Sequence, residues 1–177
     1  MFRHFKEPLR ENADNRALIA SVRRLAAELC DEPIKSLSYS SFRLFAETGS
    51  RTEYEAEYME HRRLLEVYTG MALLDPDEKW IDRLSDVIWA ISDEYTWALP
   101  AHLRGLNTPR DRVLKIDLFA SETATGFGEI LSFLGDRLPG DVRERMEYEL
   151  GRRIIDPFLK STPTFPKNNW SSVFRSF

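Results

Sequence analysis

The side chains best suited to chemistry lie near the end of the chain, where Lys167-Asn168-Asn169-Trp170 follows a proline-rich stretch. Removing a proton next to a carboxylate builds negative charge on that group, and a neutral amide that donates a hydrogen bond to it stabilises the transition state. Trp170 adds an apolar face that suits a sugar ring. We therefore interpret Asn169 and Asn168 as candidate catalytic residues of a sugar-acid site. The alternative is a frayed chain end without function.

A second group interleaves aromatic rings with guanidinium groups, and it includes Tyr39, Arg43 and Arg51. Arginine binds a carboxylate through two parallel hydrogen bonds, and an aromatic face can pack on a pyranose ring. These three residues are therefore candidate substrate-binding residues. The alternative is structural, because tyrosines four residues apart, such as Tyr54 and Tyr58, usually belong to a helical core.

His102 is the third candidate, because it follows Trp97-Ala98-Leu99-Pro100-Ala101 at a predicted helix exit, where functional residues concentrate. The alternative is a histidine that caps the preceding helix. Asp117 and Glu122 suggest the paired carboxylates of a glycosidase, but side chains five residues apart do not share a helix face. A glycosidase site is therefore weakly indicated.

The composition limits the classes of partner. The 177 residues carry a formal net charge of −4, and we expect no nucleic-acid partner, because binding phosphates requires a clustered basic face. A polyanionic sugar would likewise require local arginine or lysine. Cys30 is the single cysteine and the three histidines are scattered, so we expect no metal or other cofactor. No signal-like or membrane-spanning apolar run is visible, which predicts a cytoplasmic protein with no membrane partner.

The apolar pattern is helical almost throughout and indicates no strand. It predicts helices over about 18–29, 37–46, 52–74, 80–95, 116–134 and from about 141 to near Pro157, with Pro100 closing the fourth. Residues 102–111 read as a loop. The predicted fold class is all-α, built from helical hairpins. Spacing alone leaves open whether the hairpins form a bundle, a solenoid or a toroid.

Seven short blocks give the chain a resemblance to a known family over roughly residues 35–170. They are Tyr39-Ser40-Ser41-Phe42-Arg43, Thr48-Gly49-Ser50-Arg51, Trp97-Ala98-Leu99-Pro100-Ala101-His102, Ile116-Asp117-Leu118-Phe119-Ala120-Ser121-Glu122-Thr123-Ala124, Leu134-Gly135-Asp136-Arg137-Leu138, Arg152-Arg153-Ile154-Ile155-Asp156-Pro157-Phe158-Leu159 and Asn168-Asn169-Trp170. In this order they resemble the heparinase II/III-like polysaccharide lyases.

The resemblance implies a fold and a reaction. Members of that family join an N-terminal (α/α) toroid to a C-terminal β-sandwich, and they cleave uronic-acid polysaccharides by β-elimination. The resemblance makes Asn169, or else Asn168, the amide that neutralises the uronate carboxylate. It places His102 and Trp97 along the cleft, and Trp170 where some relatives have histidine.

The chain departs from the family pattern after Trp170. The family's catalytic tyrosine and histidine come from later sequence, so we expect residues 1–162 to form an incomplete toroid and residues 163–177 to be a tail cut short. The missing partner would be the β-sandwich half, and apolar surface exposed without it predicts self-association. The sequence therefore predicts the N-terminal part of a lyase, inactive alone, with an acidic polysaccharide or oligosaccharide as ligand. The alternative is a non-catalytic carbohydrate-binding or helical interaction domain.

Overall fold

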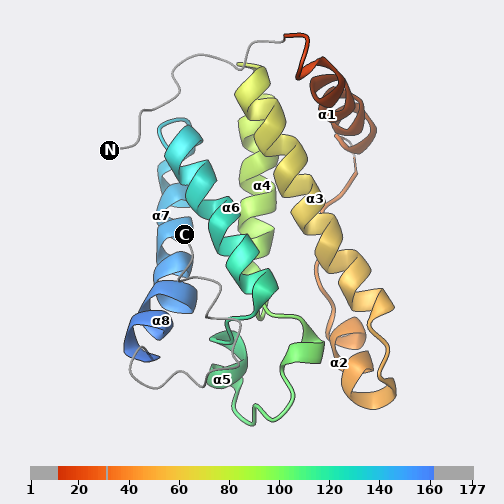
Figure 1. Ribbon diagram of the computed structural model, residues 1–177, viewed down its shortest axis with the longest axis vertical. Coiled ribbons are helices and arrows are strands. Elements are labelled where there is room, and N and C mark those ends of the chain that lie inside the picture. The colour runs from red at the N-terminus through yellow and green to blue at the C-terminus, as the bar shows by residue number, and fades with distance from the viewer. Residues whose placement is uncertain (1–11, 31, 162–177) are drawn as a thin grey trace.

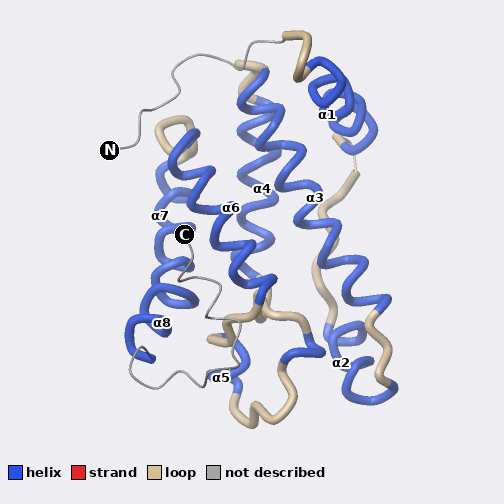
Figure 2. Tube along the Cα trace, viewed as in Figure 1, coloured by secondary structure: helices blue, strands red, loops and turns tan. Residues whose placement is uncertain are grey.

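The computed structural model describes residues 12–30 and 32–161, and all the regular structure in those ranges is helical (Figures 1 and 2). The helices are α1 (Arg16–Leu29), α2 (Tyr39–Thr48), α3 (Thr52–Leu74), α4 (Lys79–Asp93), α5 (Pro109–Val113), α6 (Leu118–Leu134), α7 (Gly140–Leu150) and α8 (Asp156–Ser161). A 3-10 turn covers Pro100–His102, and a π-helical turn, Gly151–Ile155, joins α7 to α8. The predicted all-α class is confirmed. Within the described ranges, no helix has both the length and the apolar character to cross a bilayer.

Two helical hairpins form the body of the molecule. Helices α3 and α4 make the first and α6 and α7 the second, with α3 packed on α6 and α4 on α7 (Figure 1). Helix α1 lies on α3, away from the second hairpin, and the short α2 and α5 lie at the end of the molecule where α3 begins. The hairpins thus leave one end of the body to be closed by short helices and loops.

The core between the hairpins is apolar and continuous. Its fully buried members come from all four long helices and include Tyr68, Leu84, Ile88, Phe127 and Met146. A smaller aromatic cluster of Tyr54, Tyr58 and Leu99, with Leu37, Phe42 and Phe119 packed against it, lies at the end near α2. This second cluster forms the base on which the short elements rest.

A buried ionic cluster is centred on Glu94, the residue that follows α4. Its carboxylate accepts hydrogen bonds from His61 Nδ1 at 2.8 Å and from both Nη atoms of Arg62, one of them at 2.8 Å. His61 Nε2 lies 2.5 Å from the carbonyl oxygen of Lys35, and Arg62 also donates to Thr123 of α6. Burial acts to lower the pKa of Arg62, but the attraction and hydrogen bonds of Glu94, together with the nearby Tyr58 and Tyr54, outweigh it and raise that pKa. The cluster joins α3, α6, the end of α4 and the segment before α2.

The end of α4 is capped by an arginine from the π-helical turn. Arg153 Nη2 donates to the carbonyl oxygens of Ser92, at 3.2 Å, and Glu94, at 2.8 Å. The last carbonyls of a helix lack intrahelical donors, and a cation is favoured there. Glu149 holds Arg153 in place through a 2.5 Å bond to its Nε and is itself buried. The π-helical turn therefore supplies the hydrogen-bond donor that caps α4, and it also extends α7.

The predicted helix boundaries agree with the structure to within about two residues except at three places. The sixth helix was expected to end near Pro157, but it is interrupted by the π-helical turn and the helical structure continues to Ser161. The fourth helix was expected to reach Tyr95 and to close at Pro100, but α4 ends at Asp93, because Glu94 takes an extended ψ of 137° and turns its side chain into the ionic cluster. Tyr95 consequently lies outside the helix and is half-exposed. The predicted loop 102–111 in fact leads into the short helix α5.

Replacing Glu94 tests the ionic cluster. Glu94→Gln leaves the largely buried Arg62 guanidinium without its counter-charge and weakens the acceptor that His61 bonds, so we expect it to lower the free energy of unfolding by about 3–5 kcal/mol. Urea denaturation measures the change. Glu28→Gln, which removes an exposed pair with Arg24 at 2.9 Å, is the matched control and should cost less than about 1 kcal/mol. Equal losses for the two variants would contradict a stabilising role for the cluster.

Glu149 gives the fold a dependence on pH. Burial acts to raise the pKa of Glu149, but hydrogen bonds from Arg153 and Arg152 outweigh it and hold the pKa below its ordinary value of 4.5. Because the folded-state pKa is depressed, the stabilisation is fully present above the unfolded-state pKa and is lost as pH falls through the lower folded-state value.

We therefore expect the stability gap between the unmodified chain and Glu149→Gln to narrow as pH falls below 4.5. Urea denaturation at a series of pH values measures the gap. Glu147→Gln, an exposed position on the same helix, should show no such narrowing. A gap for Glu149→Gln that stays constant across the series would contradict the expectation.

Candidate functional site

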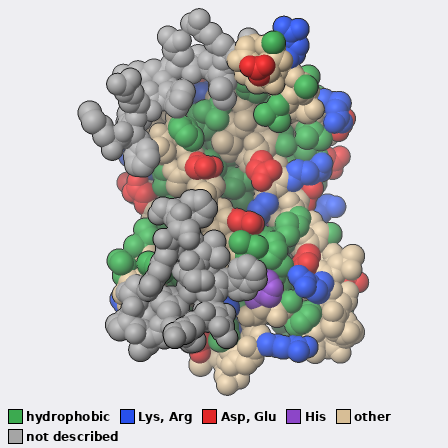
Figure 3. All heavy atoms as spheres, viewed as in Figure 1, with side chains coloured by type: hydrophobic (Ala, Val, Ile, Leu, Met, Phe, Trp, Pro, Cys, Tyr) green, Lys and Arg blue, Asp and Glu red, His purple; other side chains and the backbone are tan. Residues whose placement is uncertain are grey.

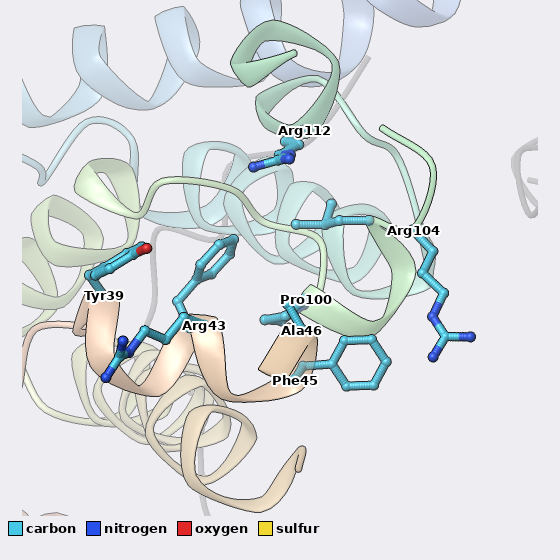
Figure 4. A pocket seen from close by; sticks show the side chains of 9 residues that line it. Tyr39, Arg43, Phe45, Ala46, Pro100, Arg104 and Arg112 are labelled. Atoms are coloured by element: carbon cyan, nitrogen blue, oxygen red, sulfur yellow. The ribbon is translucent and has the colours of Figure 1, made fainter. Parts of the chain in front are cut away.

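The surface near α2 is hollowed by two adjoining cavities of about 400 and about 370 Å³, which we call the arginine groove. Three residues line both cavities: Tyr39, Phe42 and Arg112. The first cavity is lined in addition by Arg43, Phe45, Ala46, Pro100, Leu103 and Arg104 (Figure 4), and the second by Leu37, Ser38, Tyr54 and Tyr95. The groove thus runs between α2 on one side and the segment 95–112 on the other.

Helix α2 forms one wall and is fixed at both ends. Ser38 caps its first turn by accepting a hydrogen bond from the Ser41 amide at 3.1 Å, and Gly49 ends it in the left-handed conformation at φ 79°. The Ser41 hydroxyl donates to Glu57 of α3 at 3.0 Å. Because Tyr39 and Arg43 are four residues apart, the helix presents them on the same wall.

The opposite wall is built from the 3-10 turn and α5. Residues three apart in a 3-10 turn share a face, so Pro100 and Leu103 both line the groove. Arg112 is fixed through its Nε, which donates to the carbonyl oxygen of Leu106 at 3.0 Å, and through its own carbonyl oxygen, which accepts from Thr96 Oγ1 at 2.9 Å. In Figure 4 its guanidinium lies across the groove from the helix that carries Tyr39.

All the charged side chains that line the groove are positive. Arg43, Arg104 and Arg112 line it, and its lining includes no carboxylate. Arg43 bonds Glu47 outside the groove at 3.2 Å, whereas neither Arg104 nor Arg112 makes an ion pair with a described residue. Figure 3 shows acidic and basic side chains interspersed over the face in view. In a chain of net charge −4, a lining of one sign marks a place for an anion.

The aromatic members of the groove rest on the buried cluster below. Phe42 packs edge-on against Tyr54, with ring centroids 5.7 Å apart, and against Tyr95 at 5.5 Å. Burial raises the pKa of Tyr54, and of Tyr58 beneath it, so both phenols stay neutral. This agrees with the structural interpretation of these two tyrosines. Tyr39, by contrast, is 77% exposed and free to pack on a ligand.

His102 lines neither cavity of the groove. Its Nδ1 lies 2.5 Å from Oδ2 of Asp117, and its ring stacks on Phe119 at 5.9 Å. Asp117 is buried and also accepts from the amides of Leu99 and Ala120, so it caps α6 while it orients the imidazole. The structure therefore does not bring His102 together with Tyr39 and Arg43. The histidine bonds the capping residue of α6 and not the end of α4, so the alternative interpretation, a cap of the preceding helix, is wrong.

Two further candidate residues, Trp97 and Arg51, are not found in the groove, and the weakly indicated glycosidase pair is not formed. Trp97 does not line a cleft: it is 1% exposed, its Nε1 donates to the Ile91 carbonyl oxygen at 3.0 Å, and it packs in the core. Arg51 lies at the start of α3, bonded to Glu55 at 2.5 Å, and is not part of the groove lining. Glu122 is exposed while Asp117 is buried, so the two do not form a glycosidase pair.

The candidates Asn168, Asn169 and Trp170 lie outside the described residues, and their proposed roles stay predictions. Among the residues that are described, no group of three histidine, cysteine or acidic side chains could hold a metal ion.

Sequence reasoning missed Arg104 and Arg112, which it left in or beside a predicted loop. The missed signal is local: Thr108 followed by Pro109 and, three residues on, by Asp111 is typical of a helix start. In the structure, Thr108 Oγ1 accepts from the Asp111 amide at 3.1 Å and α5 begins at Pro109. Recognising this helix start would have placed Arg112 on a helix rather than in a loop.

No protein-family model matches the chain, and a search of curated proteins found no match.

Removing the Asp117 side chain tests the link between the 3-10 turn and α6. Asp117→Ala deletes a helix cap and leaves the buried Leu99 amide without its acceptor, so we expect a loss of about 2–4 kcal/mol in the free energy of unfolding. Thr108→Ala removes an exposed cap of the same kind from α5 and should cost only about 1 kcal/mol. Denaturant unfolding compares them, and equal losses would show that the buried contacts of Asp117 add nothing.

Proposed function

We propose that the chain binds a uronic-acid-containing polysaccharide in the arginine groove, as the N-terminal helical part of a polysaccharide lyase that acts by β-elimination. The observation that carries this proposal is the lining: Arg43, Arg104 and Arg112 face a groove that also offers aromatic rings and holds no carboxylate. An anion with an apolar ring face is the ligand that this combination suits.

A uronate unit offers both features at once. Its carboxylate takes two hydrogen bonds from a guanidinium, and the C–H face of its ring covers apolar surface. Arg112 has its Nε bonded to Leu106, which leaves the Nη groups for the ligand. A neutral sugar would gain the packing on Tyr39 but no ion pair, so the groove should favour acidic sugars.

The proposal also includes the arrangement of the helices. We propose that the α3–α4 and α6–α7 hairpins are successive hairpins of an (α/α) toroid, as the resemblance to the heparinase II/III-like lyases implies. The exposed apolar side chains Tyr148 and Ile155 of the segment from α7 to α8 would pack against the remaining part of such an enzyme. Asn169, or Asn168, would neutralise the carboxylate of the sugar that reacts.

A non-catalytic carbohydrate-binding domain is the second candidate. The observation that favours it is that the groove lining offers guanidinium groups, aromatic rings and the hydroxyls of one serine and three tyrosines, but no histidine or carboxylate to accept a proton. Both candidate functions require that this chain binds the uronate ligand, and under both we expect no β-elimination by the chain alone. They differ in whether a further domain with a tyrosine and a histidine restores turnover.

Charge-removing substitutions in the groove test the binding. We expect Arg112→Gln and Arg104→Gln each to weaken the affinity for an oligouronate by roughly 10-fold or more, since a hydrogen bond to a charged group contributes about 1.5–3 kcal/mol. Isothermal titration calorimetry measures the dissociation constant. Arg110→Gln removes the same charge from an exposed position on α5 outside the groove, and should change the affinity by less than about twofold.

Two results would overturn the proposal. One is a neutral oligosaccharide of equal length that binds as tightly as the oligouronate. The other is an affinity that neither groove substitution reduces beyond the effect of Arg110→Gln, which would leave a helical interaction domain as the better interpretation. An unsaturated-uronate absorbance produced by the purified chain alone would contradict the expectation that it lacks turnover.

A further inference from the structure

The two cavities of the arginine groove meet at a shared centre. Tyr39 and Phe42 on the α2 wall and Arg112 on the opposite wall line both cavities, and every other lining residue belongs to one cavity. The residue best placed to bind an anion therefore lies at the junction, with a cavity on either side of it. A site that holds the end of a chain would instead place its anchoring charge against a closed end.

We infer that the groove binds an interior stretch of the polysaccharide, with one uronate unit at the junction on Arg112 and its two neighbours in the flanking cavities. This inference rests on the proposed function. It adds that the groove binds internal sugar units of the polysaccharide and does not require a free chain end.

The two flanks differ in chemistry. The first cavity adds Arg43, Arg104 and the Phe45 ring, so its unit is held by charge as well as packing. The second cavity adds Leu37, Tyr54 and Tyr95 and brings no further cation, so its unit is held mainly by packing. Each cavity is at the small end of the range of about 300–1,000 Å³ that ligand pockets occupy, which suits one short unit per cavity.

A length series of uronate oligomers tests the inference. The ligands for this test are the monomer, dimer and trimer, each with its reducing end blocked as a methyl glycoside, and a trimer blocked at both ends. We expect the trimer to bind at least roughly 10-fold more tightly than the monomer, because each added unit fills a further cavity. We expect the doubly blocked trimer to bind within about twofold of the singly blocked one, because the groove makes no contact that needs a free end.

Three variants assign the units to the cavities. Arg112→Gln should weaken the binding of the monomer and of the trimer by the same factor, because Arg112 lies at the junction of the two cavities. Arg104→Gln in one flank should weaken the trimer by roughly 10-fold or more, and Tyr95→Leu in the other should weaken it several-fold. Both should leave the binding of the monomer unchanged. Arg110→Gln again controls for charge on α5, and thermal unfolding confirms that each variant is folded.

The outcomes separate this inference from the proposed function. Tight trimer binding that disappears when the second end is blocked overturns the inference alone, as does a monomer that binds as tightly as the trimer. Arg104→Gln weakening the monomer as much as the trimer also overturns it, because the unit would then lie off the junction. Failure of every uronate to bind the unmodified chain overturns the inference and the proposed function together.

Discussion

The contact on which the rest of the molecule depends is the buried carboxylate of Glu94 with His61 and Arg62. It ends α4 and sends the chain out of the helix toward residues 95–112, one wall of the groove. Through His61 it also fixes the carbonyl of Lys35, from which the chain continues to α2, the other wall. The chain segments that lead to the two walls of the groove are thus held by the same ionic cluster. The buried cluster therefore fixes the points from which both walls begin.

Such a cluster is a costly way to gain stability. Moving a carboxylate and a guanidinium out of water carries a desolvation penalty that their attraction only partly recovers, and well-packed apolar side chains are often as stabilising. What the charged groups add here is a specific relative orientation of the helices. The fork of Arg62 reaches Glu94 and Thr123 from one helix, so α3, α6 and the end of α4 fit together in one arrangement. An apolar substitute would fill the space without selecting that arrangement.

The sequence predicted the long helices because their apolar residues repeat at helical spacing over several turns and their ends carry recognisable signals, such as Gly49 after α2. It could not predict that Glu94 would leave the helix, since that depends on His61 and Arg62, more than thirty residues earlier. For the site, Tyr39 and Arg43 were predicted from side-chain type, and both line the groove. Trp97 was misjudged for the same reason: residue type suggests a sugar contact, and only the fold shows that the ring is buried.

The π-helical turn at Gly151–Ile155 has a consequence for how this chain could change in evolution. A π turn is wider than an α turn and takes up about one residue more in each turn. Losing one residue there would convert it to an α turn that covers nearly the same rotation, so the side chains of α8 would keep their directions. The residues within the turn, Arg153 among them, would be the ones displaced. The turn is therefore a place where the α7–α8 segment carries one extra residue, and with it the arginine that caps α4, without losing the alignment of the two helices.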